Sequence, residues 1–221
     1  MDALERLTHY SNFVLLGEAG CGKSELAVNL ACRLRKTGRT VHLFDLDMTK
    51  PLFRTRELGA ELERMGVTLH FQQQFADAPT LVGGLRPCLT DDTSYTILDV
   101  GGDVEGARSI GGFAPLLNKE DTAVLYIINP FRPWSDTAEH AGGILSQILA
   151  VTHLKPEKVQ FVGNPNLGDG TTADDVAAGL ARLQDMVETV AFLCVEESLC
   201  DHVTVSVPVF PLRRYIAYPW Q

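Results

Sequence analysis

The sequence has 221 residues, of which 45% are hydrophobic and 21% charged, and its formal net charge is −9 at pH 7. This composition is ordinary for a globular protein with a packed core, and the length suits a single α/β domain, residues 1–221. The acidic balance argues against broad, non-specific binding of nucleic acid, which requires a basic face.

The first informative stretch is G-E-A-G-C-G-K-S at residues 17–24, which matches the phosphate-binding P-loop pattern G-x-x-x-x-G-K-[ST]. An apolar run at residues 12–16 predicts a buried strand before it, and helical spacing at residues 25–36 predicts a helix after it. Glycines allow the backbone N–H groups to surround an anion at a helix N-terminus. Lys23 would reach the outer phosphates, and the Ser24 hydroxyl would hold Mg²⁺.

The next predicted strand is residues 40–44, and it runs into Asp45-Leu46-Asp47. Two carboxylates at the carboxyl end of a strand lie where open α/β sheets bind ligands. Apolar patterns then predict a helix at residues 54–65 and a short strand at residues 67–71. Residues 72–93 have no clean period and are expected to form a loop with one helix.

Residues 94–99 form the second informative stretch, a strand that ends in Asp99 and is followed by Gly101 and Gly102. An apolar strand that delivers one carboxylate to a metal is the Walker B pattern. The remaining predicted elements are strands at 122–128, 159–163 and 203–209, a helix at 136–151, and a helix that begins at the capping box of Thr172 and Asp175. Strands that alternate with helices predict a three-layer α/β sandwich with a mostly parallel sheet.

Together these stretches resemble the SIMIBI class of P-loop NTPases, especially the MinD/ParA-like and CobQ/CobB-like proteins, over roughly residues 12–165. The resemblance implies that Asp47 orients an attacking water, that Asp45 supports the metal and that Asp99 is the Walker B acid. It also implies that Asn164 lies against adenine. The nucleotide-binding set then comprises Gly17, Ala19, Gly20, Cys21, Gly22, Lys23, Ser24, Glu25 and Asn164.

One residue departs from this resemblance. Sandwich ATPases of the MinD type have a lysine early in the loop that reaches the partner's nucleotide across a dimer, and this sequence has Glu18 there. A carboxylate near phosphates is repelled, so Glu18 is expected to point away or to pair with a cation. The lysine-across-the-dimer mechanism is therefore in doubt, whereas nucleotide binding is not.

Several weaker patterns are interpreted as structural. Residues 118–121 match the guanine-reading N-K-x-D motif, but they precede a strand and are expected to form a turn. His42 and His70 are interpreted as packed histidines and not as metal ligands. The basic, aromatic residues 211–220 are expected to fold back on the sheet and not to dock on a partner or a membrane.

The cysteines and the N-terminus indicate the compartment. The five cysteines are odd in number and have no C-x-x-C spacing, which argues against a disulfide framework or a structural zinc site. The first residues lack the basic start and apolar run of a signal peptide, and no apolar stretch is long enough to span a membrane. We therefore expect a cytoplasmic protein.

These patterns predict a Mg²⁺-dependent ATPase that acts as a nucleotide switch for a protein partner. An ATP-dependent phosphotransferase or ligase is an alternative, and its small-molecule second substrate would bind near residues 48–56 and 103–113. A non-hydrolysing nucleotide-binding adaptor is another. Dimerisation around nucleotide is common in the class that the sequence resembles, so a homodimer is possible, and the oligomeric state stays open.

Overall fold

The computed structural model describes residues 3–47, 58–71, 84–133 and 135–216. Its centre is one sheet in the order β3-β2-β4-β1-β5-β6-β7-β8, and every pairing between these strands is parallel. The strands are β1 (Asn12–Leu16), β2 (Thr40–Asp45), β3 (Val67–Phe71), β4 (Ser94–Asp99), β5 (Thr122–Ile128), β6 (Val159–Gly163), β7 (Val190–Glu196) and β8 (Val209–Leu212).

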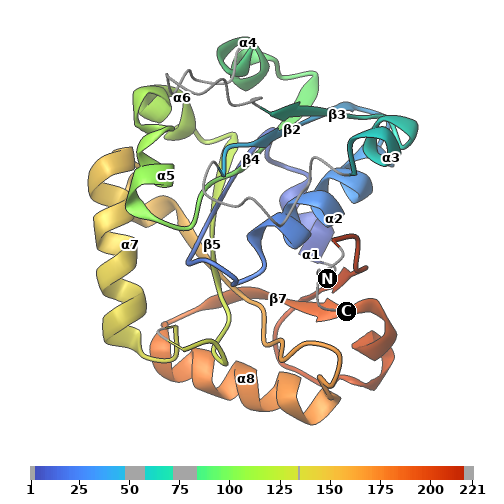
Figure 1. Ribbon diagram of the computed structural model, residues 1–221, viewed down its shortest axis with the longest axis vertical. Coiled ribbons are helices and arrows are strands. Elements are labelled where there is room, and N and C mark those ends of the chain that lie inside the picture. Colours follow the sequence, from blue (N-terminus) through green and yellow to red (C-terminus); the bar gives the residue numbers. More distant parts are fainter. Residues whose placement is uncertain (1–2, 48–57, 72–83, 134, 217–221) are drawn as a thin grey trace.

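Helices cover both faces of this sheet, and Figure 1 shows α2 and α3 on one side and α5 and α7 on the other. The three central strands β4, β1 and β5 are buried along their whole length, as expected for a parallel sheet covered twice. The helices are α1 (Ala3–Leu7), α2 (Lys23–Arg35), α3 (Gly59–Arg64), α4 (Leu85–Thr90), α5 (Val104–Arg108), α6 (Ala114–Leu117), α7 (Ala138–Thr152) and α8 (Ala173–Met186).

The two faces have separate hydrophobic cores. One core joins α1, α2 and α3 to the sheet, and the other joins α4, α5, α7 and α8 to it. The three-layer α/β sandwich predicted from the sequence is confirmed, with a wholly parallel sheet among the described strands. None of the described helices has both the length and the apolarity that crossing a bilayer requires.

The predicted strands at 12–16, 67–71, 94–99, 122–128 and 159–163 are confirmed with the same bounds. The capping box is present, since Thr172 Oγ1 accepts from the N–H of Asp175 and the Asp175 carboxylate accepts from the N–H of Thr172. The predicted helix at 54–65 is seen as α3, and its first four residues lie outside the described part of the chain.

The predicted last strand at residues 203–209 is wrong. The alternation of Val203, Val205 and Val207 resembles a half-buried strand, but these side chains only pack partly buried against the second core. The strand that the prediction missed is β7, and the chain returns to the sheet as β8 only at Val209. Because β8 is an edge strand, it tolerates Pro211, which cannot donate a ladder hydrogen bond.

Candidate functional site

The loop between β1 and α2 is curled by glycines. Gly17, Gly20 and Gly22 have φ values of 137°, 77° and 102°, which residues other than glycine rarely adopt. A Cβ on Gly17 would also collide with the carbonyl oxygen of Ile127, where β5 ends. The loop therefore lies tightly over the sheet and leads directly into the N-terminus of α2, where backbone N–H groups favour an anion.

Lys23 is the first residue of α2, and its side chain is only 1% exposed. Its Nζ donates hydrogen bonds of 2.8 Å to the carbonyl oxygens of Gly17 and Glu18. The ammonium group thus closes the loop on itself from inside. A bound phosphate would offer this cation stronger, charged acceptors than the two carbonyls.

Three buried carboxylates lie beside this loop at the carboxyl ends of β2 and β4. Asp45 and Asp99 are paired in register, and the exposed fractions of Asp45, Asp47 and Asp99 are 7%, 4% and 1%. The N–H of Asp47 donates to Asp45 Oδ1 at 3.2 Å. Since buried carboxylates are costly unless a cation or hydrogen bonds compensate them, this oxygen-rich cluster suits Mg²⁺, which prefers oxygen ligands.

The glycines after β4 bring this cluster against the phosphate-binding loop. A Cβ on Gly102 would lie 2.6 Å from the backbone nitrogen of Ala19, so the two backbones touch. A Cβ on Gly101 would lie 3.6 Å from Asp47 Oδ1. The three segments that the sequence singled out therefore meet at one edge of the sheet, the edge where parallel α/β folds bind ligands.

A cavity of about 250 Å³ opens on the other side of the same loop. Asn164 lines this cavity and also contacts the loop. Its Nδ2 donates to the carbonyl oxygen of Cys21 at 2.8 Å, and a Cβ on Gly22 would collide with the same nitrogen. Its Oδ1 is buried and has no hydrogen-bond partner within the described ranges. The walls of the cavity also include Asn129, Arg132, Asn166, Glu196 and Arg214, which the sequence analysis did not assign.

The comparisons with known proteins agree with this geometry. Residues 13–193 match the family model described as the CobQ/CobB/MinD/ParA nucleotide binding domain. The chain belongs to this family. It is thereby a P-loop NTPase of the SIMIBI class, as the sequence resemblance suggested. No curated protein matches the chain.

Solved structures of SIMIBI proteins share this fold. The signal recognition particle receptor FtsY from Elizabethkingia anophelis is 20% identical with a TM-score of 0.56, covering 90% of this chain and 64% of that one. A complex of that receptor with GDP is 18% identical with a TM-score of 0.51, covering 85% and 57%. Chloroplast FtsY from Physcomitrella patens is 18% identical with a TM-score of 0.56, covering 83% and 58%. The chain thus spans less than two thirds of the length of these proteins.

Glu18, the residue that departs from the MinD-type pattern, is connected to α7 and to the segment that enters it. Its Oε1 lies 2.6 Å from His140 Nε2, and its Oε2 accepts a hydrogen bond from the Ser135 hydroxyl. Because a carboxylate can only accept, His140 Nε2 carries the hydrogen of this contact. The expectation that Glu18 either points away or finds a partner is met by these two contacts, which anchor the phosphate-binding loop to the N-terminal turn of α7.

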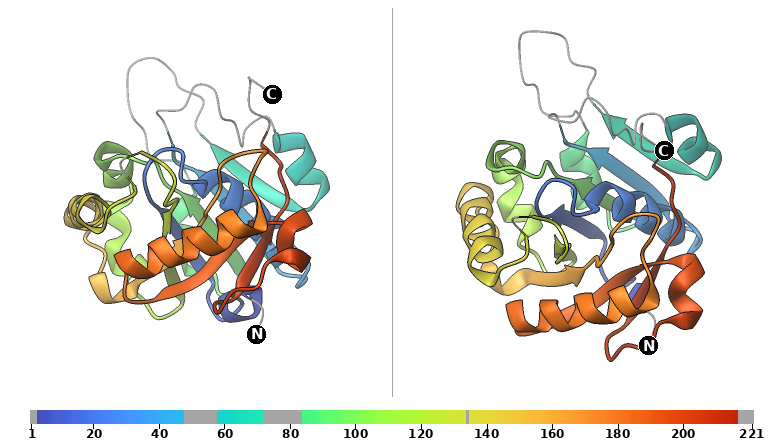
Figure 2. Two further views of the ribbon diagram at one scale, coloured as in Figure 1. Left: turned by 90° about the horizontal axis from the view of Figure 1, so that it is seen from below. Right: turned by 60° about the horizontal axis from the view of Figure 1, so that its bottom comes forward.

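The segment at residues 213–216 lies against α2, as Figure 2 shows. Glu25 accepts hydrogen bonds from the N–H groups of Tyr215 at 2.7 Å and Ile216 at 3.2 Å. Asn29 exchanges two hydrogen bonds of 2.8 Å with the backbone of Arg213. The prediction that the tail folds back is confirmed for residues 211–216, and residues 217–221 lie outside the described part of the chain. The nucleotide-binding role of Glu25 stays a prediction, since its carboxylate serves this backbone.

Burial raises the pKa of Glu25 above its ordinary value of 4.5, although the two backbone N–H groups oppose that rise. A carboxyl with a raised pKa in the folded state stabilises the fold below its unfolded pKa and loses that contribution as the pH rises through the folded pKa. We therefore expect the free energy of unfolding of wild type, relative to Glu25→Gln, to fall as the pH rises above 4.5. Urea denaturation of both proteins from about pH 4 to about pH 8 measures this difference.

The exposed Glu139 of α7 provides the matched control for this pH series. Glu139→Gln, measured across the same range, gives the effect of losing one exposed carboxylate apart from the contacts of Glu25. If the free energy of unfolding of wild type, relative to Glu25→Gln, instead increases as the pH rises, the backbone hydrogen bonds outweigh desolvation. Burial would then not be the dominant influence on the pKa of Glu25.

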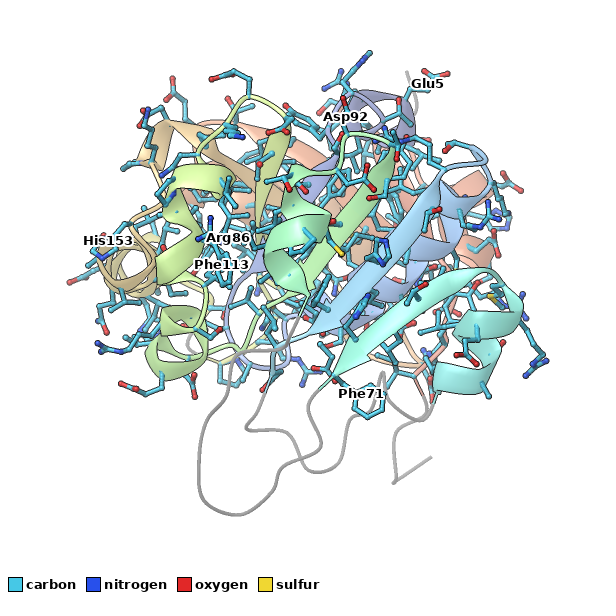
Figure 3. The ribbon with its side chains drawn as sticks, turned by 90° about the horizontal axis from the view of Figure 1, so that it is seen from above. Glu5, Phe71, Arg86, Asp92, Phe113 and His153 are labelled. Atoms are coloured by element: carbon cyan, nitrogen blue, oxygen red, sulfur yellow. The ribbon has the colours of Figure 1, made fainter. Side chains whose placement is uncertain are left out.

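The N-K-x-D residues lie far from this site, as expected. The Asn118 side chain donates to the carbonyl oxygen of His153 and accepts from the N–H of Lys155, both at 2.9 Å. These contacts hold the turn that enters β5 beside the C-terminal end of α7, where His153 is labelled in Figure 3. In a parallel sheet this is the amino edge, opposite the phosphate-binding loop, which follows the carboxyl end of β1.

Proposed function

We propose that this protein is a Mg²⁺-dependent ATPase that works as a nucleotide switch. The observation that carries the proposal is the convergence of the glycine loop, Lys23 and three buried aspartates at one sheet edge. The family and the fold support nucleotide binding and switch-like behaviour at a coarse level. ATP as the nucleotide, Mg²⁺ as the metal and hydrolysis as the reaction belong to the proposal itself.

In this proposal each residue has one task. The backbone N–H groups of residues 19–24 and the Lys23 ammonium bind the phosphates. Ser24 and Asp99 ligate Mg²⁺, with Asp45 supporting it, and the metal neutralises phosphate charge. Asp47 accepts a hydrogen bond from the attacking water and orients it in line with the terminal phosphorus.

A switch follows from where these residues lie. Asp47 is in contact range of Gly101, and Gly102 touches the phosphate-binding loop, so a terminal phosphate would be sensed by the segments that follow β2 and β4 together. A protein partner that binds these segments could then distinguish the nucleotide states. We propose such a partner in the cytoplasm, and we propose a homodimer around nucleotide as one form that the partner could take.

The choice of ATP over GTP rests on two features of the chain. Asn164 presents an amide at the cavity beside the loop, and the N-K-x-D sequence is at the opposite edge of the sheet. The FtsY structure that contains GDP is 18% identical, which bears on the fold and not on the base. We expect purified protein with Mg²⁺ to release phosphate from ATP faster than from GTP at equal concentration.

Displacement of a bound, labelled ATP analogue by unlabelled ADP or GDP measures the base preference separately from turnover. If GTP is both bound and hydrolysed better than ATP, the adenine assignment of Asn164 is wrong. If ATP binds tightly and no phosphate is released, the non-hydrolysing adaptor becomes the better proposal. A phosphotransferase or ligase would instead show turnover that a small molecule stimulates; its expected pocket near residues 48–56 and 103–113 lies partly outside the described residues.

A further inference from the structure

Three metal-ligating side chains meet at the β2–β3 side of the sheet, outside the site described above. His42 comes from β2, His70 from β3 and Cys88 from α4, and one ligand atom of each lies within 4.8 Å of the other two. The two imidazoles are closer still, with 3.1 Å between His42 Nδ1 and His70 Nε2. Figures 1 and 3 show α4, which carries Arg86, on the same side of the molecule as β2 and β3.

Packing fixes the orientation of these rings. The His70 ring stacks on Phe44 with 4.2 Å between centroids and 6° between planes, and it lies 5.2 Å from the His42 ring. All three ligating residues are half-buried. The two rings are packed, as the sequence predicted, but packing gives no reason for two imidazole nitrogens and a thiol to point into one space.

The protonation states suit a cation. Burial lowers the pKa of both histidines, and the charge of His42 lowers that of His70 further, while Asp91 acts in the opposite direction on His42. Both rings are then neutral at neutral pH, which is the form that ligates metals. In their mutual hydrogen bond one of the two facing nitrogens carries a hydrogen; on metal binding that hydrogen would move to the other nitrogen of the same ring.

We propose that His42, His70 and Cys88 form a binding site for a thiophilic divalent cation, best matched by Zn²⁺. Two imidazole nitrogens and one thiolate are borderline-soft ligands that suit Zn²⁺ and do not suit Mg²⁺ or Ca²⁺. The chain supplies three ligands, and water or an exogenous group takes the fourth tetrahedral position. Burial raises the pKa of the Cys88 thiol, so it is protonated before binding, and the thiol proton is released when the sulfur–metal bond forms.

Such a cation would connect three elements that lead to the nucleotide site. β2 ends in Asp45, and α4 precedes β4, which ends in Asp99. The proposal does not depend on ATP hydrolysis, however, because none of its three ligands belongs to the P-loop or to the aspartate cluster. Zn²⁺ binding should therefore be intact in Lys23→Ala, which separates a failure of this inference from a failure of the proposed function.

The test is titration of the full chain with Zn²⁺ against a chromophoric chelator, with excess Mg²⁺ present to saturate hard oxygen sites. We expect one Zn²⁺ per chain and about one proton released per ion at neutral pH. Co²⁺ serves as the spectroscopic probe, because a thiolate ligand gives a sulfur-to-metal charge-transfer band and tetrahedral geometry gives intense visible bands. Chains that bind no ion, or bind it without the thiolate band, would overturn the proposal.

Variants locate the ion. Cys88→Ser and His42→Gln should each weaken Zn²⁺ by at least about tenfold, since losing even an outer-shell partner costs about 10- to 100-fold. Cys200→Ser and His153→Gln are the matched controls, a half-buried thiol and a histidine elsewhere, and they should bind as wild type. If the affinity follows Cys200 or is the same in every variant, the binding is adventitious. Circular dichroism of each variant without metal verifies that it is folded.

Discussion

Lys23→Ala should remove tight nucleotide binding. The Nζ of Lys23 is the cation buried inside the phosphate-binding loop, and removing one partner of a buried charge pair costs about 2–5 kcal/mol. That corresponds to an affinity for ATP about 30- to 4,000-fold weaker. Isothermal titration calorimetry with Mg²⁺ and a non-hydrolysable ATP analogue measures the loss directly.

Two further variants make this result interpretable. Lys23→Met keeps most of the side-chain volume without the charge, so it should lose binding as Lys23→Ala does while preserving the packing of α2. Lys36→Ala removes an exposed lysine at the other end of the same helix and should bind nucleotide as wild type. An analogue that binds Lys23→Met with unchanged affinity would show that the loop is not the phosphate site.

Asp47→Asn should separate binding from turnover. The carboxylate of Asp47 is proposed to orient the attacking water, and the neutral amide of asparagine is a weaker acceptor that can also present an N–H to the water. We expect turnover to slow by about 10²-fold, the lower end of what a positioned proton-accepting side chain contributes. The affinity for ATP should change by less than about tenfold, or about 1.4 kcal/mol. Single-turnover phosphate release and analogue binding, measured on the same preparation, give the two numbers.

The exposed Asp92, on the turn before β4, is the control for this variant, and Asp92→Asn should hydrolyse ATP as wild type does. A slow Asp47→Asn with a parallel loss of binding would place Asp47 among the metal-supporting residues and not at the water. Turnover at the wild-type rate in Asp47→Asn would exclude Asp47 as the residue that orients the water.

The elements that depend on residues close together in the chain could be predicted from the sequence. The glycine loop, the strand before it, the helix after it and the capping box at Thr172 each depend on residues close together in the chain. The placement of Asp45 and Asp99 at the same edge of the sheet also followed, since both end strands of a parallel sheet, whereas their direct pairing in register came from the fold. The sequence analysis missed β7, and it placed the last strand too early because the valine alternation at 203–207 resembles a strand although it does not join the sheet.

The long-range side-chain contacts around the site could not be predicted from the sequence, because each one joins residues that are far apart in the chain. Glu18 meets His140 and Ser135 on the segment that enters α7, and Asn29 meets the backbone of Arg213. His42, His70 and Cys88 come from three elements whose relative positions depend on strand order. No periodicity or motif in the sequence connects these pairs, so only the assembled fold reveals them.

The clamp between α2 and the C-terminal segment has a consequence for the timing of synthesis. Asn29 and the Arg213 backbone that satisfies it are 184 residues apart. At about 5–20 residues per second, the ribosome makes α2 about 10–40 s before it makes the backbone of Arg213, with which Asn29 forms its hydrogen bonds. Until then, the Asn29 amide has only the acceptors that Glu25 offers within the same helix, its carbonyl oxygen at 2.9 Å and its Oε1 at 3.4 Å. The helix that follows the glycine loop is therefore translated well before the segment that packs against it.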